Sequence, residues 1–362
     1  MEKVDEAMDR DAPDHVLIGP ARHGVVRYAR DLVAALDDAG RPVRVSSLEN
    51  GEAAVRLAAT LERVHIHVTD RVLGRSPEEA ADRVEEIGSV TNLSITLHDL
   101  PQPSDGTNFA RRRQAYDRFM NAAGGVAVNS QYEAQLVEWY LGRVADGVKV
   151  IPIGARSVPT PELHAPQPLS PSAAARSVLP LRVLIAGFVY PGKGHREAIS
   201  AVGALVTRLE SEGSRPSEAT VVAIGAPSAG HEDDIDGLHQ HATRLGVEFR
   251  VTGFLNDAAY RAEMSSFGIP LAAHQHVSAS RSMVDWLELG RNALVVDSPY
   301  GREMSRLRPA TMTLYEPGLL AEFLAAAWRD PTLTHLPRGA SLAPTLEGTA
   351  RAYRAWWSGL VQ

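Results

Sequence analysis

Apolar runs alternate with longer amphipathic segments along the first 155 residues of the chain. HVLIG at residues 15–19 is a short apolar run that ends at a glycine, and residues 25–40 then carry apolar side chains at helical spacing. Similar apolar runs follow at 41–48, 64–70, 93–99, 125–130 and 148–154, with helical patterns between them. This alternation predicts a parallel sheet with helices on both faces.

The pattern breaks at residues 156–180, which are rich in proline, serine and alanine and show no period, as is typical of a linker. Strand and helix patterns resume at residue 181, with apolar runs at 181–188, 219–225, 248–254, 269–276 and 292–298. We therefore predict an α/β chain with an N-terminal Rossmann-like domain at 13–155 and a second at 181–340. An amphipathic helix at 345–362 is expected to pack back on the first domain.

Two sheets of this kind bind ligands beyond the carboxyl ends of their strands, so we expect a site in the cleft between the domains. The net charge of -7 argues against a nucleic-acid partner. The chain contains no cysteine, which excludes disulfides, thiolate zinc sites and cysteine nucleophiles. The acidic N-terminus is unlike a signal peptide, and no apolar run approaches the ~18 residues that span a bilayer. We expect a cytoplasmic protein.

Lysine is rare in this chain, which otherwise uses arginine, and only Lys3, Lys149 and Lys193 are present. Lys193 lies in a glycine-bearing loop between an apolar strand and a helix, in the segment LRVLIAGFVYPGKGHREAISAV. Backbone amides at the start of that helix, together with one compact cation, would suit a diphosphate. The segment is not a Walker loop, and a solvated loop lysine is the alternative interpretation.

This segment resembles the start of the donor domain in glycosyltransferase family 4, where a Gly-Arg pair and a Lys-Gly pair hold the nucleotide diphosphate. Gly187 and Gly194 stand at those glycines. GPARHGVVRYARDLVAAL resembles the glycine-rich first loop of the family, and Gly24 stands where a loop glycine approaches the donor. The segments VHIHVTD, ITLHDLP, GVAVNSQYEAQL, VKVIPIGA and DWLELGRNALVVDSPYGREM resemble later parts of the family pattern in the same order. The resemblance implies a GT-B fold.

The chain departs from the family pattern at two places. Phe188 occupies the position of the phosphate arginine. The E-x7-E motif is degenerate, because Asp285 stands at its second glutamate and Val277 at its first, with Ser278 beside it. Asp285 and Ser278 are the expected donor-binding residues of this region, and Glu303 matches a family loop near the donor.

Histidines and acidic residues provide further candidates. His98 ends the fourth predicted strand, where the family places a histidine near the reacting sugar; the alternative is a strand-end histidine that caps a loop. The pairs His65/His67 and His274/His276 have H-x-H spacing, but no third ligand accompanies them, so we expect no metal. Asp234-x-Asp236 is better explained as the acidic first turn of a helix.

Arg111, Arg112 and Arg113 begin a predicted amphipathic helix. A basic helix at this place could contact an anionic membrane surface, which would make the protein peripheral to the membrane; a solvated face is the alternative.

The resemblance implies metal-independent transfer of a sugar, with retention, from a nucleoside diphosphate sugar to an acceptor hydroxyl on a glycan, a lipid-linked acceptor or a small molecule. His98 and Lys193 are the expected catalytic residues, Gly24, Gly187 and Gly194 approach the donor, and no cofactor beyond the donor substrate is expected. A non-catalytic partner subunit or nucleotide-sugar sensor is the main alternative. A sugar-nucleotide epimerase, a phosphorylase and a plain interaction module are further alternatives.

Overall fold

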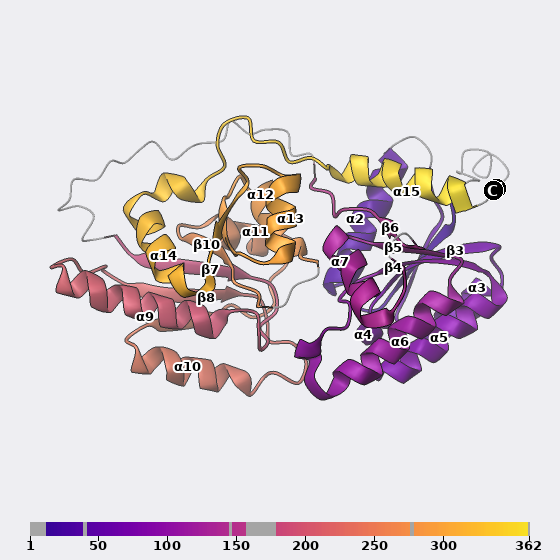
Figure 1. Cartoon of the computed structure of the whole chain (residues 1–362), viewed down its shortest axis with the longest axis horizontal. Helices are drawn as coiled ribbons and strands as arrows, with labels where there is room; N and C mark the ends of the chain where they lie inside the picture. The colour runs from indigo at the N-terminus through magenta and orange to yellow at the C-terminus, as the bar shows by residue number, and fades with distance from the viewer. Residues whose placement is uncertain (1–11, 39–41, 145–146, 157–178, 276–278, 361–362) are drawn as a thin grey trace. The chain divides into compact units, whose positions relative to one another are not determined.

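The computed structural model describes residues 12–38, 42–144, 147–156, 179–275 and 279–360, and it divides the chain into two units (Figure 1). Unit 1 comprises residues up to 157 together with residues from 343 onward, and unit 2 comprises residues 158–342. The predicted linker at 156–180 lies almost entirely outside the described residues, as do Val277 and Ser278.

Unit 1 contains a six-stranded parallel sheet in the order β2-β1-β3-β4-β5-β6. The chain winds from β1 in both directions, which is the flavodoxin-like order of doubly wound sheets. Each predicted apolar run of this unit contains a strand. The strands are β1 (Asp14–Ile18), β2 (Val45–Leu48), β3 (Arg63–Val68), β4 (Asn92–Leu97), β5 (Gly125–Val128) and β6 (Lys149–Val150).

Helices cover both faces of this sheet, α2 and α15 on one and α3, α5 and α6 on the other (Figure 1). Local sequence fixes their starts: Ser76 accepts a hydrogen bond from the backbone N–H of Glu79, and Pro77 takes the first position of α5. The helices are α2 (Gly24–Asp38), α3 (Gly51–Ala58), α4 (Asp70–Leu73), α5 (Pro77–Val90), α6 (Phe109–Ala122), α7 (Gln131–Leu136) and α15 (Leu346–Leu360), with short turns η1 (Pro103–Asn108) and η2 (Val137–Leu141).

Unit 2 contains a second six-stranded parallel sheet, in the order β12-β11-β10-β7-β8-β9. Counted from β7, this is the 3-2-1-4-5-6 order of the Rossmann fold. The strands are β7 (Leu181–Ala186), β8 (Ala219–Ile224), β9 (Glu248–Val251), β10 (Ile269–Ala272), β11 (Ala293–Val296) and β12 (Met312–Tyr315). The helices are α9 (His195–Ser211), α10 (Asp234–Arg244), α11 (Asp257–Ser265), α12 (Arg281–Glu288), α13 (Pro299–Leu307) and α14 (Leu320–Arg329).

The predicted fold class is confirmed, because both units are parallel α/β sheets of Rossmann-like topology. The sequence pattern missed β12, whose four residues lie between two helices in a segment without clear strand periodicity. In unit 1, α15 packs on α2, and its Tyr353 hydroxyl lies 2.9 Å from the Thr96 hydroxyl of β4. Among the described residues, no helix is long and apolar enough to cross a membrane.

Candidate functional site

The strand order of unit 2 reverses between β7 and β10. The chain leaves β7 toward β8 on one side and returns to β10 on the other, and doubly wound sheets bind ligands in the crevice at such a reversal. Lys193 lies in the loop after β7, and His274 lies just after β10. The two side chains meet there, with Lys193 Nζ 2.5 Å from His274 Nε2.

Glycines shape the loop that carries Lys193. Gly187 has φ +106°, and a Cβ at this position would lie 3.1 Å from Lys193 Nζ. Gly194 has φ +97° and precedes α9, and a Cβ there would lie 2.4 Å from the carbonyl oxygen of Ala273. Both positions therefore require glycine, one to admit the lysine amine over the backbone and the other to bring the helix start against β10.

Lys193 is buried and forms no ion pair among the described residues. Its side chain is only 5% exposed, and no carboxylate lies within ion-pair distance of it in the described part of the chain. Burial lowers the pKa of Lys193 to about 7, although the nearby charge of Asp285 opposes this shift. Burial also lowers the pKa of His195 to about 3, and it lowers the pKa of His274 well below its ordinary value. A cation next to neutral imidazoles and a helix N-terminus can accept an anionic ligand.

The carboxylate of Asp285 already has internal partners. Arg281 Nε lies 3.0 Å from Asp285 Oδ1, and the Tyr260 hydroxyl donates to Oδ2 at 3.3 Å. Arg281 also contacts the buried Glu288 at 2.6 Å. On α12, the residue predicted to bind the donor is thus part of an ion-pair network within unit 2.

The other predicted donor residues of this unit are less closely grouped. Phe188 is 37% exposed, so the position of the missing arginine carries a solvent-accessible aromatic ring. Glu303 is half-buried in the second turn of α13, after the carboxyl end of β11. Ser278, like Val277, lies outside the described residues.

In unit 1, His98 follows the carboxyl end of β4 and points into the interior. Its Nε2 lies 3.0 Å from His67 Nδ1, and the ring packs edge-on against Tyr28 of α2. Burial lowers the pKa of His98 to about 3, so the imidazole is neutral at physiological pH. Asp99 follows with φ +53°, a left-handed conformation that is uncommon for residues other than glycine, and its side chain is 60% exposed.

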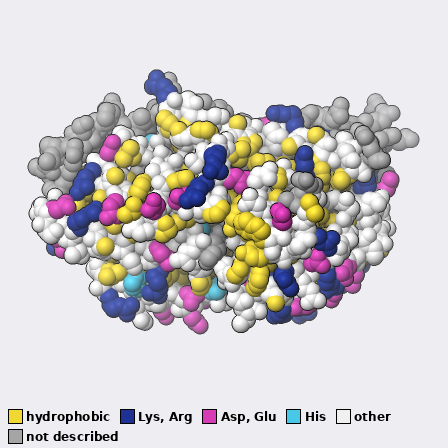
Figure 2. All heavy atoms as spheres, in the orientation of Figure 1, with side chains coloured by type: hydrophobic (Ala, Val, Ile, Leu, Met, Phe, Trp, Pro, Cys, Tyr) yellow, Lys and Arg dark blue, Asp and Glu magenta, His cyan; other side chains and the backbone are white. Residues whose placement is uncertain are grey.

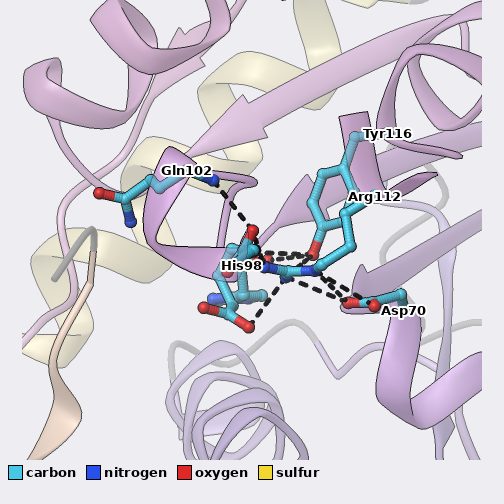
Figure 3. Close-up of polar contacts among 7 residues, drawn as sticks. Asp70, His98, Gln102, Arg112 and Tyr116 are labelled. Carbon is cyan, nitrogen blue, oxygen red and sulfur yellow. Dashed lines mark hydrogen bonds and ion pairs between the residues drawn. The ribbon is translucent and has the colours of Figure 1, made fainter. Parts of the chain in front are cut away.

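Arg112 of α6 binds the His98–Asp99 corner, which is the sharp bend that follows β4 (Figure 3). Its NH2 group donates to the Asp99 carbonyl at 2.6 Å and to Asp99 Oδ2 at 3.0 Å. NH1 contacts Asp105 at 2.6 Å, and Nε and NH2 contact Asp70 at 3.2 Å. Tyr116, one turn along the same helix, donates from its hydroxyl to the His98 carbonyl at 2.7 Å.

The arginine triplet does not form the continuous basic face that a membrane contact would need. Arg112 is 7% exposed and points into unit 1, because neighbouring helix positions differ by about 100° and the middle residue faces the core. Arg111 pairs with Glu78 of α5 at 2.7 Å. Arg118 of α6 pairs with Asp82 and Glu85 of α5. Acidic side chains accompany the basic ones over α5 and α6 (Figure 2).

The remaining candidates are placed as follows. Gly24 starts α2, and a Cβ there would meet no atom within 4 Å, so this face is open in the described chain. His65 and His67 share one face of β3, with ring centroids 5.0 Å apart. Among the described residues, no three His, Cys, Asp or Glu side chains are grouped to hold a metal ion. Asp234 and Asp236 lie in the first turn of α10, which confirms the helix interpretation of that acidic segment.

The sequence did not predict the contacts of three residues at these sites. The strand-end position of His274 predicted that it lines the site, but not that its ring lies against the amine of Lys193. Asp99 has a left-handed φ that no pattern in the sequence predicts. The acidic partners of Arg112 lie after β3, after β4 and in η1, and only the fold brings these three segments together.

No protein-family profile matches the chain, and no curated protein matches it in sequence. Solved structures do match it over most of its length, and the shared fold is GT-B. Anabaena Alr3699/HepE in complex with UDP and glucose has a TM-score of 0.62 at 17% identity, covering 96% of this chain and 98% of that one. Sucrose-phosphate synthase (tll1590) from Thermosynechococcus elongatus has a TM-score of 0.61 at 16% identity, covering 96% of both chains.

A more distant match is the α,α-trehalose 6-phosphate synthase of Burkholderia multivorans. It has a TM-score of 0.53 at 14% identity, covering 85% of this chain and 71% of that one. At these identities the comparisons establish the fold, and the chemistry of this chain rests on its own residues.

Proposed function

We propose that this chain is a glycosyltransferase that resembles family 4 and binds the diphosphate of a nucleoside diphosphate sugar at Lys193. The observation that carries the proposal is the buried Lys193 at the strand-order reversal of unit 2, which forms no ion pair with any described carboxylate. An uncompensated buried cation is costly, and a bound diphosphate would supply the missing negative charge.

The surroundings of Lys193 support an anionic ligand of this size. Gly194 brings the N-terminus of α9 beside the amine, so backbone N–H groups and the helix dipole add to its charge. When the sugar leaves, negative charge grows on the diphosphate. Fixed donors aimed at that charge would stabilise the transition state. Alr3699/HepE, with the same fold, has been crystallised with UDP and with UDP-glucose, which makes a uridine donor the first to test.

We assign the sugar end of the reaction to the His98 corner of unit 1 and to the α12 region of unit 2. With Asp285 engaged by Arg281, its oxygen would reach a donor hydroxyl only alongside that arginine. Gly24 and Glu303 would line the donor site, and the acceptor is a hydroxyl-bearing glycan, lipid-linked molecule or small molecule. Transfer would proceed with retention and without a metal ion.

Calorimetric titration with UDP, GDP, ADP and dTDP tests the diphosphate site directly. We expect one nucleotide to bind the wild type and to bind Lys193→Ala roughly 10- to 100-fold more weakly, as expected for loss of a charged hydrogen bond. Lys149→Ala is the matched control, because Lys149 is exposed on β6 of the other unit. Equal affinity in wild type and Lys193→Ala would place the diphosphate elsewhere.

The corresponding sugar nucleotide is then supplied with candidate acceptors, with and without EDTA. Unchanged turnover in EDTA supports metal independence, and the anomeric coupling of the product in NMR reports its configuration. An inverted product would exclude retention.

A non-catalytic sensor or partner subunit is the second candidate. The ion pair between Asp285 and Arg281 favours it, because this pair withdraws the one carboxylate left at the family motif. Nucleotide binding that depends on Lys193, without turnover on any acceptor and without donor hydrolysis or epimerisation, would select this candidate.

A further inference from the structure

We propose that Arg112 and Tyr116 are positioning residues, which hold the His98–Asp99 corner in its left-handed conformation and thereby set the place of His98. The inference rests on the proposed function insofar as His98 takes part in sugar transfer. Neither Arg112 nor Tyr116 is assigned to contact with the substrate.

The guanidinium of Arg112 joins three separate segments of unit 1. Its NH2 group binds both the carbonyl and the carboxylate of Asp99, at 2.6 Å and 3.0 Å. Its other contacts are with Asp70, at the start of α4 after β3, and with Asp105 in η1. Because Asp70 is itself buried, the arginine is anchored on one side and can hold the exposed corner on the other. Figure 3 shows this arrangement.

Tyr116 binds the backbone of the same corner. Its hydroxyl lies 2.7 Å from the carbonyl oxygen of His98 and 3.0 Å from that of Asp99, so one donor faces two consecutive carbonyls. Consecutive carbonyls turn toward one point only when the chain bends sharply, and the φ of +53° at Asp99 provides that bend. A left-handed aspartate persists where surrounding contacts over-determine it, which is common at functional sites.

The corner also fixes the His98 ring. The backbone of His98 is bound by Tyr116 on the α6 side, while its ring is bound by His67 and packed on Tyr28 on the α2 side. We therefore expect a change of the corner to move the His98 ring away from His67.

The test uses Arg112→Lys and Tyr116→Phe in the full chain. Lysine keeps the charge but lacks the planar fork that reaches three partners, and phenylalanine removes only the hydroxyl. We expect kcat to fall at least tenfold in Arg112→Lys and at least threefold in Tyr116→Phe. KM for the sugar nucleotide and Kd for the nucleotide should stay within twofold, because Lys193 belongs to unit 2.

Arg118→Lys is the matched control, since Arg118 lies on the same helix and pairs with acids at the surface. Asp99→Asn provides a rescue test, because asparagine adopts left-handed backbone more readily than aspartate. In a double-mutant cycle, Asp99→Asn should restore part of the kcat lost in Arg112→Lys. A rise in KM that accompanies the fall in kcat in Arg112→Lys would overturn the positioning role. A fall in kcat of similar size in Arg118→Lys would also overturn it.

A second measurement decides the question even if no turnover is found. In protein labelled with ¹⁵N-histidine, the hydrogen-bonded imidazole proton between His67 and His98 is protected from solvent. Its exchange should become at least tenfold faster in Arg112→Lys and remain unchanged in Arg118→Lys. Unchanged exchange in Arg112→Lys would refute the inference, whereas a wild type that binds no nucleotide would refute only the proposed function.

Discussion

Replacing His15 by leucine should make the stability of unit 1 less dependent on pH. His15 lies on β1 and is fully buried, and its two ring nitrogens have no hydrogen-bond partner in the described part of the chain. It packs edge-on against Trp357 of α15, at 5.0 Å between ring centroids, and it neighbours His65. Burial lowers the pKa of His15 to about 3, so this imidazole stays neutral while the unfolded chain still binds protons.

Proton linkage gives the sign and the size of this change in stability with pH. The unfolded state binds more protons than the folded state below an unfolded pKa of about 6.5, so stability is complete above that pH and falls as the pH drops through it. Between pH 7.5 and 5.5, one histidine with a folded pKa of about 3 costs about 1.4 kcal/mol. His98 should cost a similar amount, and the lowered pKa values of His65 and His67 act in the same direction.

Urea unfolding followed by tryptophan fluorescence at pH 7.5 and 5.5 measures this term. The stability difference between His15→Leu and wild type should shift by about 1.4 kcal/mol in favour of the variant at the lower pH, whatever its value at pH 7.5. His239→Leu is the comparison variant, since His239 is exposed on α10, whereas His15 is buried. A His15→Leu difference that does not change with pH would show that this ring is not held neutral.

Two further predictions concern the loop at Lys193. With a pKa of about 7, raising the pH from 7 to 8.5 should weaken nucleotide binding about tenfold in wild type, because the protonated amine is lost; Lys193→Arg should remove this dependence in calorimetry. Gly194→Ala should destabilise unit 2 by ~3 kcal/mol or more and abolish nucleotide binding, since its Cβ would lie 2.4 Å from Ala273. Gly213→Ala, also at positive φ but with nothing within 4 Å, should cost only about 1–2 kcal/mol in the same urea assay. Equal costs for the two glycines would contradict the close-approach argument.

The sequence predicted the sheets of this chain, except for β12, because most strands lie in short apolar runs, several of which are followed by a glycine or an aspartate. The same pattern placed His98 at the end of β4 and Lys193 between β7 and α9, since such positions depend on local order alone. Burial could not be predicted in the same way. Nothing near Lys193 in the sequence indicates that His274 lies 2.5 Å from its amine.

Arg112 shows most clearly which contacts the sequence does not predict. Charge composition favoured a surface role for the triplet, because arginine is usually exposed unless it is paired. Two of the carboxylates that pair with Arg112 belong to Asp70 and Asp105. Asp70 is distant from Arg112 along the chain, and Asp105 lies in the preceding turn η1. By contrast, the pair between Arg281 and Asp285 has i,i+4 spacing, so helical geometry alone could have identified it.

The placement of α15 has a consequence for how the protein is made. Unit 1 uses this helix to cover the face that carries His15, His65 and Thr96, yet unit 2 is encoded between the two parts of unit 1. At typical elongation rates of about 5–20 residues per second, roughly 10–40 s separate synthesis of residue 157 from that of residue 343. During that interval the ribosome-bound chain lacks the helix that covers His15 and His65, so this face of unit 1 stays uncovered until unit 2 has been synthesised. Nascent unit 1 is therefore the part of the chain that would need protection by a chaperone.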